Sequence, residues 1–226
     1  MNESIEEKRK PTILRFRIST RLNYLLFPID GQELIEAVAK IGYKVPPLPA
    51  PLDIHATVGF TGSFAQNGEV VLDGSADRSI LGVTAKSYDQ AIKAFDELSS
   101  LILKVLKVNL EKGSRFYEIQ ADLKFDSTGN PLESISSTFK RNQFMSNVAK
   151  ILKQDISMFT LRFVTEGKVP NQEEWLDITI EPSIIMPNQR YNISVVFRSK
   201  DKSTVEKFGE SLESNILSII KTIEKS

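Results

Sequence analysis

One pattern occurs twice in this chain, and the repetition limits the folds that the chain can adopt. Val38 lies in the segment AVAKI, and Val148 lies in the similar segment NVAKI, 110 residues later (148 minus 38). Phe95 in IKAF and Phe208 in VEKF are separated by 113 residues (208 minus 95). Because the two separations differ by only three residues, we expect a tandem duplication in which each half contains the same elements in the same order.

The first predicted element is a half-buried strand near the N-terminus. Its hydrophobic residues alternate with polar ones, so that one set faces the core and the other faces solvent. The hydrophobic set is Leu14, Phe16, Ile18, Leu22 and Tyr24, and the opposite face presents Arg15, Arg17 and Arg21. After this strand, Asp30 and Glu33 predict the capped start of a short helix, which Gly42 is expected to end in a left-handed conformation.

Strands and turns are predicted for the rest of the first half. Alternation indicates strands around 54–61, 70–72 and 81–85, and the pairs Asn67-Gly68 and Asp73-Gly74 predict the turns between them. Ser87, with Gln90 three residues later, is expected to cap a long helix that ends near Asn109. The proline-rich stretch 45–52 is interpreted as an extended spacer rather than as a ligand for a proline-recognising domain.

The second half repeats this order of elements. Strands are predicted around 117–125, 159–163, 176–180 and 191–197, with a helix around 144–152 and a final helix capped by Ser203 and Glu206. We therefore predict an α+β fold, a tandem duplication of a strand-helix-three strands-helix unit, with an antiparallel sheet and helices on one face. The predicted parts are a disordered tail at 1–11, a first repeat at 12–108, a linker at 109–114 and a second repeat at 115–226, which can also fuse into one domain.

This order of elements, over about residues 13–223, resembles the fold of the TATA-box-binding protein family. That family duplicates a strand, helix, sheet, helix unit into a curved saddle. The segment Gly82-Val83-Thr84-Ala85-Lys86-Ser87, which leads into the closing helix, is similar to the family's strand-to-helix junction. The resemblance implies a continuous curved sheet whose concave face binds a partner.

The expected open face of the sheet differs from a DNA-binding saddle. Such saddles insert apolar wedges between bases, and single-strand binders stack bases on aromatic rings. Here the large groups Phe16, Phe60, Phe159 and Phe163 are in phase with the helix-side core, and acidic side chains such as Glu118 and Asp122 would repel phosphates. We therefore favour a solvated face over a nucleic-acid interface. The candidates for binding nucleic acid or another partner are Arg15, Arg17, Arg21, Arg162 and Arg198.

The composition favours no catalytic or metal chemistry. The chain has no cysteine and a single histidine, His55, so thiolate nucleophiles and multi-histidine zinc sites are not expected. Neither a phosphate-binding glycine loop nor a serine nucleophile elbow occurs. Asp177 and Glu181 share one strand face at a separation of about 13 Å, too far for a carboxylate dyad. We predict no cofactor, no metal and no catalytic residue, although an enzyme built from carboxylates of different strands stays open.

The charge balance and hydropathy complete the prediction. The 29 basic residues balance the 29 acidic ones, so no long-range field steers the chain toward a polyanion. No apolar run approaches the about 18 residues that span a bilayer, and we expect a soluble cytoplasmic protein without membrane association.

Our hypothesis is a non-catalytic binding or interaction module for a protein partner. The alternatives are a nucleic-acid-binding protein that uses the open sheet face, and a carrier of a small apolar ligand between helices and sheet.

Overall fold

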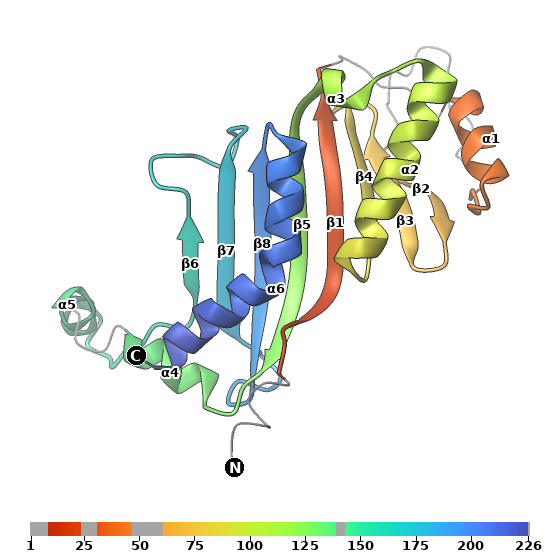
Figure 1. Ribbon diagram of the computed structural model, residues 1–226. Coiled ribbons are helices and arrows are strands. Elements are labelled where there is room, and N and C mark those ends of the chain that lie inside the picture. The colour runs from red at the N-terminus through yellow and green to blue at the C-terminus, as the bar shows by residue number, and fades with distance from the viewer. Residues whose placement is uncertain (1–8, 24–30, 47–60, 139–142, 226) are drawn as a thin grey trace.

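A single eight-stranded sheet organises the protein (Figure 1). The computed structural model describes residues 9–23, 31–46, 61–138 and 143–225. Neighbouring strands are antiparallel, in the order β2-β3-β4-β1-β5-β8-β7-β6. The strands are β1 (Thr12–Leu22), β2 (Thr61–Asn67), β3 (Val70–Ser75), β4 (Ile80–Ala85), β5 (Ser114–Asp126), β6 (Leu161–Val164), β7 (Trp175–Pro182) and β8 (Arg190–Ser199).

The two halves of the chain meet at the centre of this sheet. β1 pairs with β5, with Ile18 opposite Ile119, so one continuous sheet contains both halves. From this central pair the order is β4, β3, β2 on one side and β8, β7, β6 on the other. The predicted α+β fold with an antiparallel sheet is confirmed. A common origin of the two halves by duplication stays a prediction.

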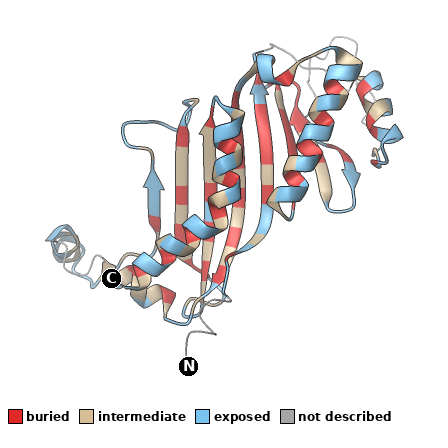
Figure 2. Cartoon of the chain, in the orientation of Figure 1, coloured by how far each residue is buried: buried red, intermediate tan, exposed pale blue. Residues whose placement is uncertain are grey.

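Two long helices, α2 and α6, cover the same face of the sheet (Figure 1). α2 packs on β4, β1 and β3, and α6 packs on β5 and β8. Figure 2 shows the buried residues concentrated where these helices meet the strands, and Phe16, Phe95 and Ile216 are among them. The helices are α1 (Gln32–Lys40), α2 (Tyr88–Leu106), α3 (Leu110–Gly113), α4 (Pro131–Thr138), α5 (Gln143–Leu152) and α6 (Lys202–Glu224).

Two of the predicted helix ends are confirmed. Ser87 caps α2, since its hydroxyl accepts a hydrogen bond of 3.3 Å from the backbone N–H of Gln90. Gly42 follows α1 with φ +95°, the left-handed conformation that a side chain would strain. The predicted linker 109–114 contains the one-turn helix α3, whose Leu110 is buried.

Two predicted helix starts are wrong. Gly31, not Asp30, occupies the N-cap of α1 and makes no side-chain cap, while Asp30 itself lies outside the described residues. The N-cap of α6 is Asp201, two residues before the predicted Ser203, because its carboxylate accepts from the backbone N–H groups of residues 203 and 204. Asp201 and Ser203 are both good caps, and the sequence alone does not rank them.

A β-bulge changes the face of one predicted core residue. The pairing of β1 with β5 shifts between Ile13 and Arg15, which leaves Leu14 as the extra residue. Leu14 is therefore 50% exposed, and Ile13 packs against the core in its place. The predicted core positions Phe16, Ile18 and Leu22 are buried, whereas Tyr24 lies outside the described residues.

The turns of the first half are partly as predicted. The β2–β3 hairpin closes after Asn67 through Gly68, which has φ +57°. The predicted turn at Asp73-Gly74 is wrong, because both residues pair inside β3 and the chain turns at 76–79 instead. The predicted strand at 54–60, including Phe60, and the proline-rich stretch from residue 47 onward lie outside the described part of the chain.

The edge strand β6 is less covered than predicted. Phe163 pairs with Ile178 and has the predicted helix-side phase, but it is 43% exposed. Phe159, predicted as a core strand residue, precedes β6 and is also exposed. β6 has only four residues and lies at the end of the sheet, where α6 does not cover it (Figure 1).

Candidate binding site on the open sheet face

Four of the five arginines predicted as binding residues form ion pairs on the open face, which is the face opposite α2 and α6. Each pairs with a carboxylate on a different strand, which is the adjacent strand in three pairs and lies two strands away for Arg17 and Asp73. The four pairs are Arg15 with Asp122, Arg17 with Asp73, Arg162 with Asp177, and Arg198 with Glu118. Hydrogen bonding to Asp177 raises the pKa of Arg162. The acidic residues of the face therefore neutralise most of its arginines locally.

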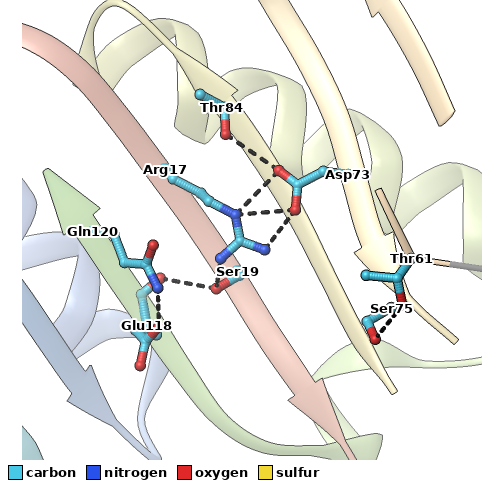
Figure 3. Close-up of polar contacts among 8 residues, drawn as sticks. All are labelled: Arg17, Ser19, Thr61, Asp73, Ser75, Thr84, Glu118 and Gln120. Carbon is cyan, nitrogen blue, oxygen red and sulfur yellow. Dashed lines mark hydrogen bonds and ion pairs between the residues drawn. The ribbon is translucent and has the colours of Figure 1, made fainter. Parts of the chain in front are cut away.

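The Arg17–Asp73 pair spans three strands (Figure 3). Arg17 lies on β1, Asp73 lies on β3, and the guanidinium crosses the intervening β4 above Gly82. Its Nη2 donates to Asp73 Oδ1 at 2.6 Å, and Thr84 Oγ1 donates to the other carboxylate oxygen at 3.2 Å. A Cβ at position 82 would lie 2.7 Å from Arg17 Cζ, so the glycine makes room for the crossing. The two side chains are only 14% and 21% exposed.

Ser19 joins this pair to the second half of the sheet (Figure 3). Arg17 Nη1 donates to Ser19 Oγ at 2.8 Å, and the Ser19 hydroxyl points to the backbone oxygen of Glu118 at 3.5 Å. Gln120 Nε2 donates to the Glu118 carboxylate at 2.6 Å. A hydrogen-bonded row therefore runs across the centre of the open face from β3 to β5.

Arg198 fixes the other end of this row. Its Nε donates to Glu118 at 2.7 Å, and its Nη1 donates to the backbone oxygens of Pro170 and Gln172 at 2.9 Å and 2.7 Å. Its guanidinium carbon also lies 4.5 Å from the centre of the Phe116 ring. Arg198 thus holds the connection between β6 and β7 against the open face of the sheet. Its charge is balanced by Glu118, so its role here is structural.

Two large aromatic residues on this face were missed by sequence reasoning. Phe116 has the phase of Glu118 on β5, and Trp175 has the phase of Asp177 on β7 and pairs with Arg198. Both are buried but lie outside the main core cluster. Both residues alternate in the sequence with residues of the helix side, and this alternation could have placed them on the open face. The large apolar groups of the sheet are therefore not confined to the helix side.

A pocket of about 450 Å³ opens beside these residues at the C-terminal end of β1. It is lined by Arg17, Arg21, Arg78 and Arg198, with Thr20, Phe116, Gln120 and Asn171 among the other groups. We call it the open-face pocket. Arg21 and Arg78 make no ion pair with any residue that the structure describes. These two cations are the available charges in the pocket.

The open-face pocket brings together three of the five predicted arginines. Arg17, Arg21 and Arg198 line it, whereas Arg15 and Arg162 lie outside. Arg78 was missed, because it belongs to the 76–79 turn and the predicted turn was placed at Asp73-Gly74 instead. The correct β3–β4 turn was therefore the information needed to find this residue.

Within the described ranges, no three His, Cys, Asp or Glu side chains group in a way that suits a metal ion, and His55 lies outside those ranges. No helix in the same ranges is long and apolar enough to cross a bilayer. The cytoplasmic location stays a prediction.

The sequence matches no protein-family model and has no significant similarity to a curated protein. The function must therefore be inferred from the chemistry of the open face.

Proposed function

We propose that the chain is a non-catalytic binding module that holds an acidic group of a protein partner in the open-face pocket. The observation that carries this proposal is the contrast between the arginines of the face. Arg15, Arg17, Arg162 and Arg198 are paired, while Arg21 and Arg78 have no carboxylate partner among the described residues. A carboxylate between them would receive charge-assisted hydrogen bonds of the strong, directional kind.

The walls of the pocket suit such a ligand. Ile80, Phe116 and Pro170 contribute apolar surface, which lowers the local dielectric and strengthens an interaction between an arginine and a carboxylate. Gln120 and Asn171 offer neutral hydrogen-bonding groups beside it. A glutamate or aspartate side chain of a partner, or its terminal carboxylate, therefore matches the pocket in charge and polarity.

Nucleic acid fits this face less well. Proteins that hold a phosphate backbone typically make several phosphate contacts, each of which releases about one counterion. The paired arginines of this face would first have to leave Asp122, Asp73, Asp177 or Glu118, and those carboxylates would then face the phosphates. With Arg21 and Arg78 as the available cations, we expect a salt dependence of at most about two counterions.

The carrier hypothesis receives no comparable support. Side chains such as Ile18, Phe95 and Leu98 fill the layer between helices and sheet and are almost fully buried. Binding of an apolar ligand there stays a prediction.

The single tryptophan of the chain provides the test. Trp175 pairs with Arg198, which lines the open-face pocket, so its fluorescence should respond to occupancy of the pocket. We expect saturable binding of a glutamate hexapeptide and none of a glutamine hexapeptide. The double substitution Arg21→Ala with Arg78→Ala should weaken binding at least about tenfold, the effect of losing about 1.4 kcal/mol or more of charge-assisted bonding.

Arg15→Ala is the matched control, because Arg15 is on the same face but outside the pocket. Its affinity for the glutamate peptide should equal that of the wild type. Unchanged affinity of the double variant would overturn the proposal. Tight binding of a single-stranded oligonucleotide with a steep salt dependence would instead favour the nucleic-acid alternative.

A further inference from the structure

Strand β6 forms one end of the sheet, and on its outer side it pairs with no strand that the structure describes (Figure 1). The outer edge of such a strand presents a row of backbone N–H and C=O groups that can pair with another chain. Phe159, Phe163 and Val164, which lie on this strand or just before it, are all exposed. Figure 2 shows most of β6 in the exposed colour.

The strand at the opposite end of the sheet is already paired on its outer side. Beside β2, the Lys44 N–H donates to the backbone oxygen of Gln66 at 2.8 Å, and the Gln66 N–H donates back at 2.9 Å. A lysine at an edge also disfavours pairing with another chain. β6 contains neither lysine nor proline. The two ends of the sheet are therefore unequal, and β6 is the end that suits pairing with a further strand.

The hydrogen bonds to β7 define which backbone groups of β6 point outward. The Thr165 N–H donates to the backbone oxygen of Leu176 at 3.1 Å, and these two residues continue the β6–β7 register. The direction of these groups alternates along an antiparallel ladder, so those of Phe163 also face β7. The N–H and C=O groups of Arg162 and Val164 therefore point away from the sheet.

The extended chain continues one residue before β6. Thr160 follows in the register opposite Glu181, and its hydroxyl donates to the Glu181 carboxylate at 3.3 Å. Thr160 is two residues from Arg162, so the same alternation points its N–H and C=O groups outward. Both positions therefore offer a donor and an acceptor to a second strand.

We propose that two copies of this chain pair β6 with β6 in antiparallel orientation, so that one sheet continues through both copies. A two-fold axis perpendicular to the sheet at Leu161 fits the outward groups. It places Thr160 opposite Arg162 of the second copy, where the two residues exchange two backbone hydrogen bonds. Because the interface is symmetric, the same exchange occurs twice.

This register also brings the exposed aromatic rings together. On the helix side of the sheet, Phe159 lies opposite Phe163 of the second copy, and the reciprocal pair forms on the other side of the axis. Aromatic residues directly opposite one another are a favourable cross-strand pair. An axis one residue further on would instead place Arg162 opposite itself, and like charges in that position are destabilising.

The charges at this edge allow two identical copies to meet. Arg162 is the one charged residue between positions 156 and 165, and its Nε and Nη2 already donate to Asp177 at 3.0 Å and 2.7 Å. The chain has 29 basic and 29 acidic residues, so no net charge separates two copies. Two short strands make a small interface, and we therefore expect a weak dimer that depends on concentration.

Sedimentation equilibrium of the full chain tests this proposal. Between about 10 µM and about 1 mM, the average mass should rise from that of a monomer toward that of a dimer. It should not rise beyond a dimer, because pairing of β6 leaves each copy with the β2 edge that Lys44 occupies. Filaments or larger oligomers would contradict this geometry and overturn the proposal.

A pair of substitutions at one position separates the backbone from the side chain. Arg162→Pro should weaken association at least about tenfold, because proline lacks the outward N–H, and an edge position whose N–H faces solvent tolerates proline in the monomer. Arg162→Ala is the matched control, since it loses the same side chain but keeps the N–H. This control should associate like the wild type, and equal association of both variants would overturn the proposal.

Hydrogen exchange provides a readout that needs no substitution. The amide protons of Thr160 and Arg162 should exchange at least about twofold more slowly at about 1 mM than at about 10 µM, because dimerisation protects them. The Gln66 amide is the control, since its bond to Lys44 lies within one copy and its exchange rate should not change with concentration. A dimer without slower exchange at Thr160 and Arg162 would place the interface elsewhere and overturn the proposal.

The remaining outcomes separate this inference from the proposed function and from another occupant. Arg21→Ala with Arg78→Ala should dimerise like the wild type, so the edge and the open-face pocket succeed or fail independently. A chain that stays monomeric at about 1 mM would overturn the proposal. If that monomer instead shows slower exchange at Thr160 and Arg162 on addition of an alternating threonine-valine hexapeptide, the occupant is a strand of another protein.

Discussion

Arg17 reaches Asp73 because residue 82 has no side chain. A Cβ there would lie 2.7 Å from Arg17 Cζ, so Gly82→Ala should displace the guanidinium from a carboxylate that is only 21% exposed. We expect the free energy of unfolding to fall by about 2 kcal/mol, the typical loss when a partly buried charge loses its partner. Chemical denaturation of the variant measures this change.

A double-mutant cycle provides the control for this prediction. If the Arg17–Asp73 pair is the cause, Gly82→Ala should destabilise the Arg17→Ala variant by far less than it destabilises the wild type. An equal loss of unfolding free energy in both backgrounds would mean that alanine at position 82 destabilises strand β4 independently of the ion pair.

The arginine face could be predicted from the sequence, but its partners could not. Strict alternation placed Arg15, Arg17 and Arg21 on one face, as the structure has them. Asp73 was assigned to a turn, because Asp-Gly is a strong local turn signal. Its ion-pair partner lies 56 residues away, and local pattern contains no information on strand register at that distance.

The contact of α6 with the start of α2 depends on Gly209. A Cβ at this position would lie 2.7 Å from Tyr88 Cδ2 and 3.1 Å from Ile119 Cδ1. Alanine would favour the helix by about 1 kcal/mol, but overpacking against a ring that also contacts Phe16 typically costs about 1–3 kcal/mol. We therefore expect Gly209→Ala to lower the melting temperature. Ser214→Ala on the exposed side of α6 is the control, and a raised melting temperature for Gly209→Ala would contradict the account.

The start of α6 is expected to be acid-sensitive. Hydrogen bonds from Thr204 and Ser203 lower the pKa of Asp201 from its usual 3.8 to about 2. Because the folded-state pKa is the lower one, the stabilisation by the ionised cap is complete above about pH 3.8 and is lost as the pH falls through about 2. Asp201→Asn keeps a neutral capping oxygen. Between about pH 5 and pH 2 the melting temperature of the wild type should therefore fall more than that of this variant; parallel curves would show that the Asp201 charge plays no part.

At the scale of the whole molecule, the order of elements was predictable and their coverage was not. Periodicity placed most of the described strands and the long helices, because that signal is local, whereas two helix starts and the helix α4 were not predicted. The sequence segments around Val38 and Val148 are alike, yet α1 packs on α2 while α5 lies exposed. Whether another element packs over a helix depends on the tertiary arrangement, which local sequence patterns do not determine. A shared origin of the halves stays a prediction, which superposition of equivalent residues such as Phe95 and Phe208 would test.

The central claim is that Arg21 and Arg78 hold an acidic group in the open-face pocket, and the resonances of the arginine side chains test it most directly. In a titration with the glutamate hexapeptide, the Nε–Hε signals of Arg21 and Arg78 should shift saturably with one common affinity. Those of Arg15 and Arg162, which are paired outside the pocket, should stay in place. Equal shifts of all four arginines, or no shift of Arg21 and Arg78 at saturating peptide, would contradict the account.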